Sequence, residues 1–152
     1  MFALTGCEKT AQVKPQIYSS ANFTLSYNEM QSTGKILIDE NKNISLSVDS
    51  PESLKGFSAK TDGEKFTVNY NGITASYDTK DLPDSTFFKL AFYSLKKFTD
   101  TEKIEFNKTD DSYIGTENTE LGEVKIELNE EHFIKSIRIP NQGFYLELTK
   151  NI

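Results

Sequence analysis

An α+β fold is predicted by this sequence: a strongly curved antiparallel β-sheet of about 8–10 strands, a half-barrel, with its concave face covered by one main helix. Most of the chain alternates apolar and polar residues at period 2, the pattern of strands that bury one face and expose the other. Short groups of turn residues separate these segments, so consecutive strands are expected to be antiparallel neighbours. One stretch, residues 85–98, changes to a helical period and is the expected cover of the sheet.

The first seven residues contain a short motif around the single cysteine. Leu4-Thr5-Gly6-Cys7 resembles the lipobox of bacterial lipoproteins, and the resemblance implies that the Cys7 thiol receives a diacylglycerol. A signal peptide has a basic n-region and roughly 7–15 apolar residues, whereas only residues 1–5 precede Gly6-Cys7. We therefore interpret residues 1–7 as a truncated signal peptide with its lipobox, in which two acyl chains on Cys7 make a stable anchor. The alternative is an accidental match in a disordered leader.

Residues 8–20 separate this motif from the first patterned segment. They combine Lys, Gln, Thr, Ser and Pro15 with no helical or strand period. Such a segment is predicted to be a flexible spacer between the membrane and the domain. The remaining residues, 21–152, form one half-barrel domain, because a chain of 152 residues has the length of a single domain with its own core.

Alternating runs make up the first part of the sheet. The first strand places Phe23, Leu25 and Tyr27 on one face and polar residues on the other. Asn71-Gly72 is typical of a type I′ hairpin turn, because both residues tolerate positive φ. The next strands are predicted at Lys35–Asp39, Asn43–Val48, Glu64–Tyr70 and Ile73–Tyr77, with Phe57–Lys60 as a further short candidate.

Residues 85–98 carry the helix. Asp84 or Ser85 can cap its first turn. At 100° per residue the apolar side chains cover an arc of roughly 200°, so this helix must be largely enclosed. Its apolar residues are the candidate wall of a hydrophobic groove: Phe87, Leu90, Ala91, Leu95 and Phe98. The alternative for the same residues is a filled, dry core.

Strands resume after the helix. Val124, Ile126 and Leu128 alternate with charged residues, and Gly115 and Gly122 permit a bend or a turn on either side. The predicted strands are Lys103–Phe106, Ser112–Thr116, Glu123–Leu128, Phe133–Ile139 and Phe144–Leu148.

Charge and motif content exclude several classes of function. A formal net charge of −6 disfavours nucleic acid and electrostatic docking on anionic lipid. One cysteine and one histidine, His132, are too few for an internal disulfide or a zinc site, and Asp39–Asn43 is a hairpin turn without the glycine of a calcium loop. The chain has no phosphate-binding loop, nucleophile elbow or HExxH motif. We therefore expect no enzyme activity, no metal, no cofactor and no nucleic-acid partner.

The order of elements resembles the LolA/LolB/LppX-like family of bacterial lipoprotein-sorting carriers. The similarity covers roughly residues 23–148. It rests on Thr33-Gly34 opening a strand, Ser50-Pro51 ending one, Thr61-Asp62-Gly63 before Phe66–Tyr70, and Tyr77-Asp78 ahead of the helix. The resemblance implies a half-barrel whose curved sheet wraps a hydrophobic groove plugged by helices. Because those carriers begin with an amphipathic helix, which residues 8–20 do not show, we expect a membrane-tethered relative.

The sequence supports three hypotheses about function. The first is a bacterial envelope lipoprotein, anchored on the extracytoplasmic face of the cell membrane, that binds an acyl chain or other apolar ligand between sheet and helix. The second is a non-catalytic interaction or structural module with a dry core, which presents its polar face or a sheet edge to another envelope protein. The third is an envelope enzyme with acidic residues clustered in a cleft. We expect a monomer, and we favour the first hypothesis over the second and the second over the third.

Overall fold

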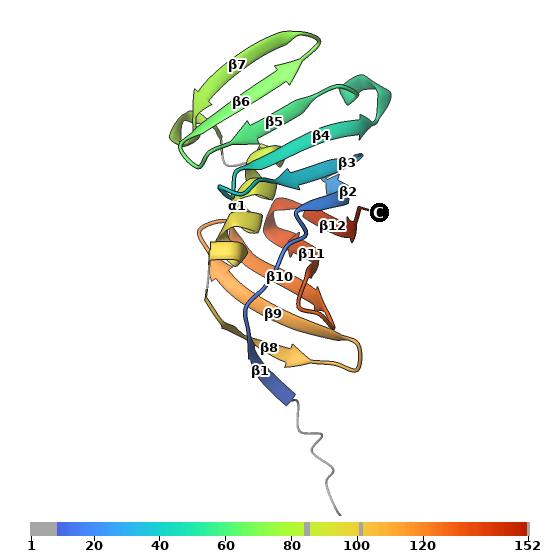
Figure 1. Cartoon of the computed structure of the whole chain (residues 1–152), viewed down its shortest axis with the longest axis vertical. Helices are drawn as coiled ribbons and strands as arrows, with labels where there is room; N and C mark the ends of the chain where they lie inside the picture. Colours follow the sequence, from blue (N-terminus) through green and yellow to red (C-terminus); the bar gives the residue numbers. More distant parts are fainter. Residues whose placement is uncertain (1–8, 84–85, 101, 152) are drawn as a thin grey trace, which may run out of the picture.

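Twelve strands make one antiparallel sheet in the part of the chain that the structure describes, residues 9–83, 86–100 and 102–151 of a computed structural model (Figure 1). Two meanders, β2–β7 and β8–β12, are joined by the β12–β2 pair, and β1 adds to the far edge by pairing with β8. The strands are β1 (Lys9–Val13), β2 (Ser20–Tyr27), β3 (Met30–Ile38), β4 (Ile44–Ser50), β5 (Ser58–Thr61), β6 (Lys65–Tyr70), β7 (Ile73–Asp78), β8 (Ile104–Lys108), β9 (Ser112–Thr119), β10 (Gly122–Asn129), β11 (Ile134–Ile139) and β12 (Phe144–Lys150).

One α-helix, α1 (Phe87–Asp100), is present among the described residues and lies against the sheet where the two meanders meet (Figure 1). Three short 3-10 turns complete the chain: η1 (Glu52–Leu54), η2 (Thr79–Asp81) and η3 (Pro140–Gln142). The predicted α+β class, a curved antiparallel sheet with one covering helix, is confirmed. The described sheet has twelve strands, more than the 8–10 predicted, partly because residues 9–13 add β1.

The helix begins and ends later than the predicted residues 85–98. Helical bonding starts at Thr86, whose carbonyl accepts from Leu90 N at 3.0 Å, while its Oγ1 donates to Pro83 O at 2.8 Å. The proposed caps Asp84 and Ser85 lie outside the described residues. Inside the helix, the buried Ser94 hydroxyl donates to Leu90 O at 2.8 Å, so this polar group is satisfied.

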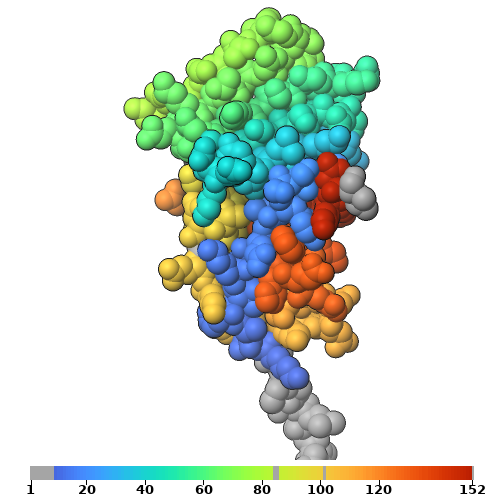
Figure 2. Space-filling view, in the orientation of Figure 1, coloured from blue at the N-terminus to red at the C-terminus, as the bar shows by residue number. Residues whose placement is uncertain are grey.

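The N-terminal segment differs from the flexible spacer expected over residues 8–20. Lys9–Val13 form β1, which pairs antiparallel with β8, and Val13 is buried. Farther along, Gln16 N donates to His132 O at 2.9 Å, and Tyr18 stacks on Phe133 with ring centroids 4.1 Å apart. Figure 2 shows this segment, in blue, running over one face of the molecule beside α1, in yellow. It is ordered because its few apolar side chains gain burial and its backbone completes a sheet edge.

The core lies between the sheet and α1. It is filled by every second residue of the strands, whose side chains point inward. In the first meander these residues include Phe23, Leu25, Ile36, Leu46 and Val48. The second meander contributes Phe106, Val124, Ile126, Leu128 and Leu146. Burial of these side chains is the main favourable term in folding, at roughly 25 cal/mol per Å² of apolar surface.

Strand β7 departs from this pattern. The alternation predicts that Ile73, Ala75 and Tyr77 share a buried face, but Ile73 is 74% exposed and Tyr77 46% exposed. β7 pairs only with β6 and ends the sheet, so no further element covers it among the described residues. The turn before it is as predicted, because Asn71 and Gly72 both have positive φ, 52° and 79°.

Candidate functional site

The structure places the five predicted groove residues mainly in the core. Leu90, Ala91, Leu95 and Phe98 have no exposed surface. Phe87 is partly buried and contacts Phe57, with ring centroids 5.6 Å apart. These side chains form the packed face of α1.

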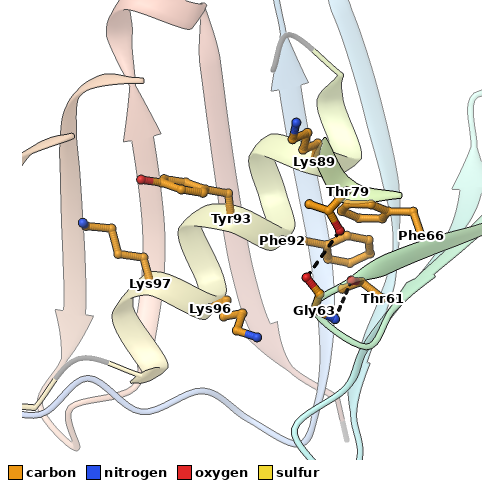
Figure 3. A pocket seen from close by; sticks show the side chains of 9 residues that line it. All are labelled: Thr61, Gly63, Phe66, Thr79, Lys89, Phe92, Tyr93, Lys96 and Lys97. Atoms are coloured by element: carbon orange, nitrogen blue, oxygen red, sulfur yellow. Dashed lines mark hydrogen bonds between the residues drawn. The ribbon is translucent and has the colours of Figure 1, made fainter. Parts of the chain in front are cut away.

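A hollow of about 270 Å³ lies at the margin of α1, between the helix and the hairpin of β5 and β6 (Figure 3). We call it the helix–hairpin pocket. From the helix it is lined by Lys89, Phe92, Tyr93, Lys96 and Lys97. From the sheet side it is lined by Thr61, Gly63, Phe66 and Thr79.

The floor of the helix–hairpin pocket is aromatic. Phe66 of β6 and Phe92 of α1 stack with ring centroids 5.4 Å apart and an interplanar angle of 21°. Phe88 packs edge-on against Phe66 at 5.6 Å and so supports the floor from behind. All three rings are buried, and Phe66 and Phe92 are the two that line the pocket.

The hairpin wall is held by two hydroxyl groups. Gly63 N donates to Thr61 Oγ1 at 3.0 Å, and Thr79 Oγ1 donates to Gly63 O at 3.3 Å (Figure 3). Gly63 has a φ of +100°, a conformation that favours glycine, so the turn presents bare backbone to the pocket. The wall is therefore hydrogen-bonded on both sides of Gly63 and carries no side chain at this residue.

Three lysines of α1 are among the residues that line the pocket. Lys89 Nζ donates to Leu82 O at 2.6 Å, and Lys97 Nζ lies 3.9 Å from Glu117 Oε2. Lys96 Nζ lies over Gly63, within 2.8 Å of where a Cβ on that glycine would stand. The rim is therefore locally positive in a chain whose formal net charge is −6.

Two of the other hollows on the surface of the described residues have a similar or greater volume. One of about 350 Å³ adjoins the helix–hairpin pocket and shares Lys96 with it, and polar groups such as Asn41, Asn43 and Asp62 line it. The other lies on the sheet face that carries Arg138 and Tyr145, where the guanidinium sits 4.8 Å from the tyrosine ring centre. Partial burial, followed by the hydrogen bond to Glu147, raises the pKa of Tyr145, so its hydroxyl stays protonated and donates to Glu147 Oε2 at 3.0 Å.

No group of three or more His, Cys, Asp or Glu side chains in the described ranges could hold a metal ion. The ring of His132 packs edge-on against Tyr113 at 4.9 Å. No helix within these ranges is long and apolar enough to cross a membrane. Cys7, the predicted lipid-attachment residue, lies outside the described residues.

Sequence reasoning did not single out the helix–hairpin pocket. The helix positions that line it include Lys89, Phe92, Tyr93 and Lys96, which have the i, i+3, i+4, i+7 spacing of one helix face. That spacing is a signal that could have indicated a common surface. The partner ring, Phe66, could not have been assigned, because nothing in the sequence shows which strand lies beside that face.

Comparison with known proteins shows a distant structural likeness. No protein-family profile and no curated protein matches the chain. The chain is similar to the crystal structure of a LolA superfamily protein from Nitrosomonas europaea, with 10% sequence identity, a TM-score of 0.42, and coverage of 90% of this chain and 86% of that one. A likeness at this TM-score is too weak to assign a function.

Proposed function

We propose that this protein binds a small apolar or amphipathic ligand in the helix–hairpin pocket. The observation that supports this most directly is the open hollow of about 270 Å³ above the stacked rings of Phe66 and Phe92. Ligand sites are typically concave and mostly apolar, with a few polar groups that fix orientation, and here Thr61, Thr79 and the lysines supply such groups.

The ligand would lie beside the helix rather than beneath it. The face of α1 that points into the half-barrel is filled by Leu90, Leu95 and Phe98, none of which is exposed. An interior at native packing density leaves no room for an acyl chain without large rearrangement. The pocket volume is close to the lower limit of the usual range for ligand sites, which suits one short alkyl chain.

We further propose that the protein is a lipoprotein anchored through Cys7 to the extracytoplasmic face of a bacterial membrane. The support is the sequence Leu4-Thr5-Gly6-Cys7. Only Glu8 separates Cys7 from the first residue of β1, a span of at most about 7 Å between the Cα atoms of Cys7 and Lys9. An acylated Cys7 would therefore hold the domain directly at the bilayer surface. Cys7→Ala should move the protein from the membrane fraction to the soluble fraction.

Blocking the helix–hairpin pocket tests the binding function. Thr79→Phe places a ring in the pocket wall, whereas Thr67→Phe places the same ring at an exposed position of β6. Decanol is titrated while amide chemical shifts are followed by NMR. The wild type and Thr67→Phe should shift at residues around Phe66 and Phe92. Thr79→Phe should lose these shifts while remaining folded, with a melting temperature slightly lowered by the loss of the hydrogen bond from Thr79 Oγ1 to Gly63 O. Unchanged shifts in folded Thr79→Phe would place any binding elsewhere.

A second candidate function, an interaction module, is favoured by the open edge at β7. This strand exposes Ile73 and Tyr77 and contains neither lysine nor proline, the residues that usually protect an edge strand. Ile73→Lys with Tyr77→Lys should abolish association with an envelope partner and leave decanol binding unchanged. Association that survives this double change would remove the edge from consideration.

A further inference from the structure

We infer that the ligand of the helix–hairpin pocket is an amphiphile with an anionic head, and that Lys96 binds this head while the alkyl chain lies on the rings of Phe66 and Phe92. The inference depends on the proposed function and narrows it to one chemical class. Carboxylate and phosphate heads share the chemistry that a lysine ammonium recognises.

The three lysines that line the pocket differ in how they are engaged. The Lys89 ammonium is tied to the carbonyl of Leu82. Lys97 is within ion-pair distance of Glu117, which occupies part of its charge. For Lys96, by contrast, no ion pair or hydrogen bond is found among the residues described, and its side chain is exposed. It is the cation best placed to accept a new partner without losing an existing one.

The side chain of Lys96 lies close to the turn on the opposite side of the pocket. It points from α1 toward Gly63, where the positive φ and the missing side chain let the ammonium come close to the backbone (Figure 3). The same side chain borders both the helix–hairpin pocket and the neighbouring polar hollow. A chain lying on the aromatic floor would therefore place its head at Lys96, where the apolar surface gives way to polar groups.

The acidic groups that line the same polar hollow as Lys96 leave its charge available. The Asp62 carboxylate accepts hydrogen bonds from Glu64 N at 3.0 Å and Lys65 N at 2.9 Å. Asp100 lines the polar hollow together with Lys96, but no ion pair forms between them in the described structure. An anionic head in the pocket mouth would meet the exposed ammonium and form a charge-assisted hydrogen bond with it.

The test compares ligands with the same tail and different heads. Decanoate, decyl phosphate and decanol are titrated calorimetrically into the full chain at low and at physiological salt. We expect the anionic ligands to bind roughly tenfold or more tightly than decanol, and this preference to shrink as salt is added. The ratio of decanoate to decyl phosphate affinity shows whether a fatty-acid head or a phosphate head is preferred.

Variants of the lysine assign the effect to one group. Lys96→Gln should reduce the affinity for decanoate to that for decanol, and Lys96→Arg should retain the preference. Lys103→Gln, an exposed lysine away from the pocket, is the matched control and should behave as the wild type.

Two outcomes would overturn the inference. If all three ligands bind the wild type equally, the ligand does not need an anionic head. If the preference for anionic ligands persists in Lys96→Gln, Lys96 does not bind the head. Either result would contradict the inference and leave the proposed function standing. Failure of every ligand to bind would remove the proposed function as well.

Discussion

The two meanders both pack against α1, but the helix covers them to different extents. On the side of β10 and β12, alternate residues such as Val124, Leu128 and Leu146 are completely buried, and α1 packs against β12. On the side of β6 and β7, burial fades from Phe66 to the exposed Ile73. The helix–hairpin pocket lies at this second margin, where α1 touches the sheet through aromatic rings and covers it incompletely.

This difference shows where binding space comes from in such a fold. Both meanders carry the same period-2 alternation, so the pattern alone does not separate a sealed wall from an open one. What separates them is the position of a single helix, because one helix cannot cover the concave face of a sheet this wide. The uncovered strip is available for a ligand, and the edge strand beside it is available for a partner.

The largest effect is expected from truncating the sealed side. Phe144→Ala removes a fully buried ring of β12 and should lower the free energy of unfolding by about 3–5 kcal/mol. The matched change on the open side, Ile73→Ala, removes a largely exposed side chain and should stay within about 0.5 kcal/mol. Urea unfolding measures both. Similar losses for the two variants would mean that the meanders are not closed differently.

A smaller effect separates two buried glycines, one in each meander. A Cβ on Gly34 would stand 1.9 Å from the backbone oxygen of Ser47 and 2.7 Å from the ring of Phe23. A Cβ on Gly115 would meet only side chains, with the Phe106 ring nearest at 2.7 Å. Overpacking typically lowers the free energy of unfolding by about 1–3 kcal/mol. Because backbone cannot move aside as a ring can, Gly34→Ala should lower it by at least the upper end of this range and Gly115→Ala by the lower end.

The urea midpoints of these two alanine variants, at unchanged slope, give the comparison. If Gly115→Ala were the more destabilised, the ring of Phe106 would be held more firmly than the strand that carries Ser47. The second meander would then be the more rigid one even at its outer strands.

Most of the architecture could be predicted because its signals are local. Alternation located the strands, the change of period located the helix to within two residues, and Asn71-Gly72 identified a turn that has positive φ at both residues. β1 was missed because Ala11 and Val13 are two apolar residues in a polar segment, too short a pattern to stand out. Their burial depends on β8, which lies about a hundred residues away in the chain.

The candidate site was less predictable because it depends on contacts between distant segments. The helix residues expected to form a groove are the most deeply buried ones, because the most apolar face of a helix is the face that packs into the core. The pocket instead uses the boundary between the apolar and the charged face, where Phe92 and Lys96 are neighbours. Only the placement of the β5–β6 hairpin opposite this boundary turns it into a hollow.

The smallest expected effect concerns acid sensitivity, which should differ between turns of the two meanders. In the β3–β4 turn, the Asp39 carboxylate accepts from Asn41 N and Asn43 N, both at 2.9 Å. The Asn43 bond in particular holds the pKa of Asp39 below its usual 3.8. In the β10–β11 turn the corresponding acceptor is the neutral Asn129 amide, which accepts from Glu131 N and Phe133 N at 3.0 Å.

Since the folded pKa of Asp39 is depressed, its contribution to stability is present above pH 3.8 and is lost as the pH falls through the folded value. Acidification should therefore speed hydrogen exchange at the Asn43 amide more than at the Phe133 amide, after correction for intrinsic rates. In Asp39→Asn the side chain can still accept these bonds but no longer titrates, so the two amides should respond alike. If the Asn43 amide still responds more strongly than the Phe133 amide in this variant, the acid sensitivity arises from another group. Asp62 in the β5–β6 turn would then be the next carboxylate to replace, because hydrogen bonds from the Lys65 and Glu64 amides lower its pKa in the same way.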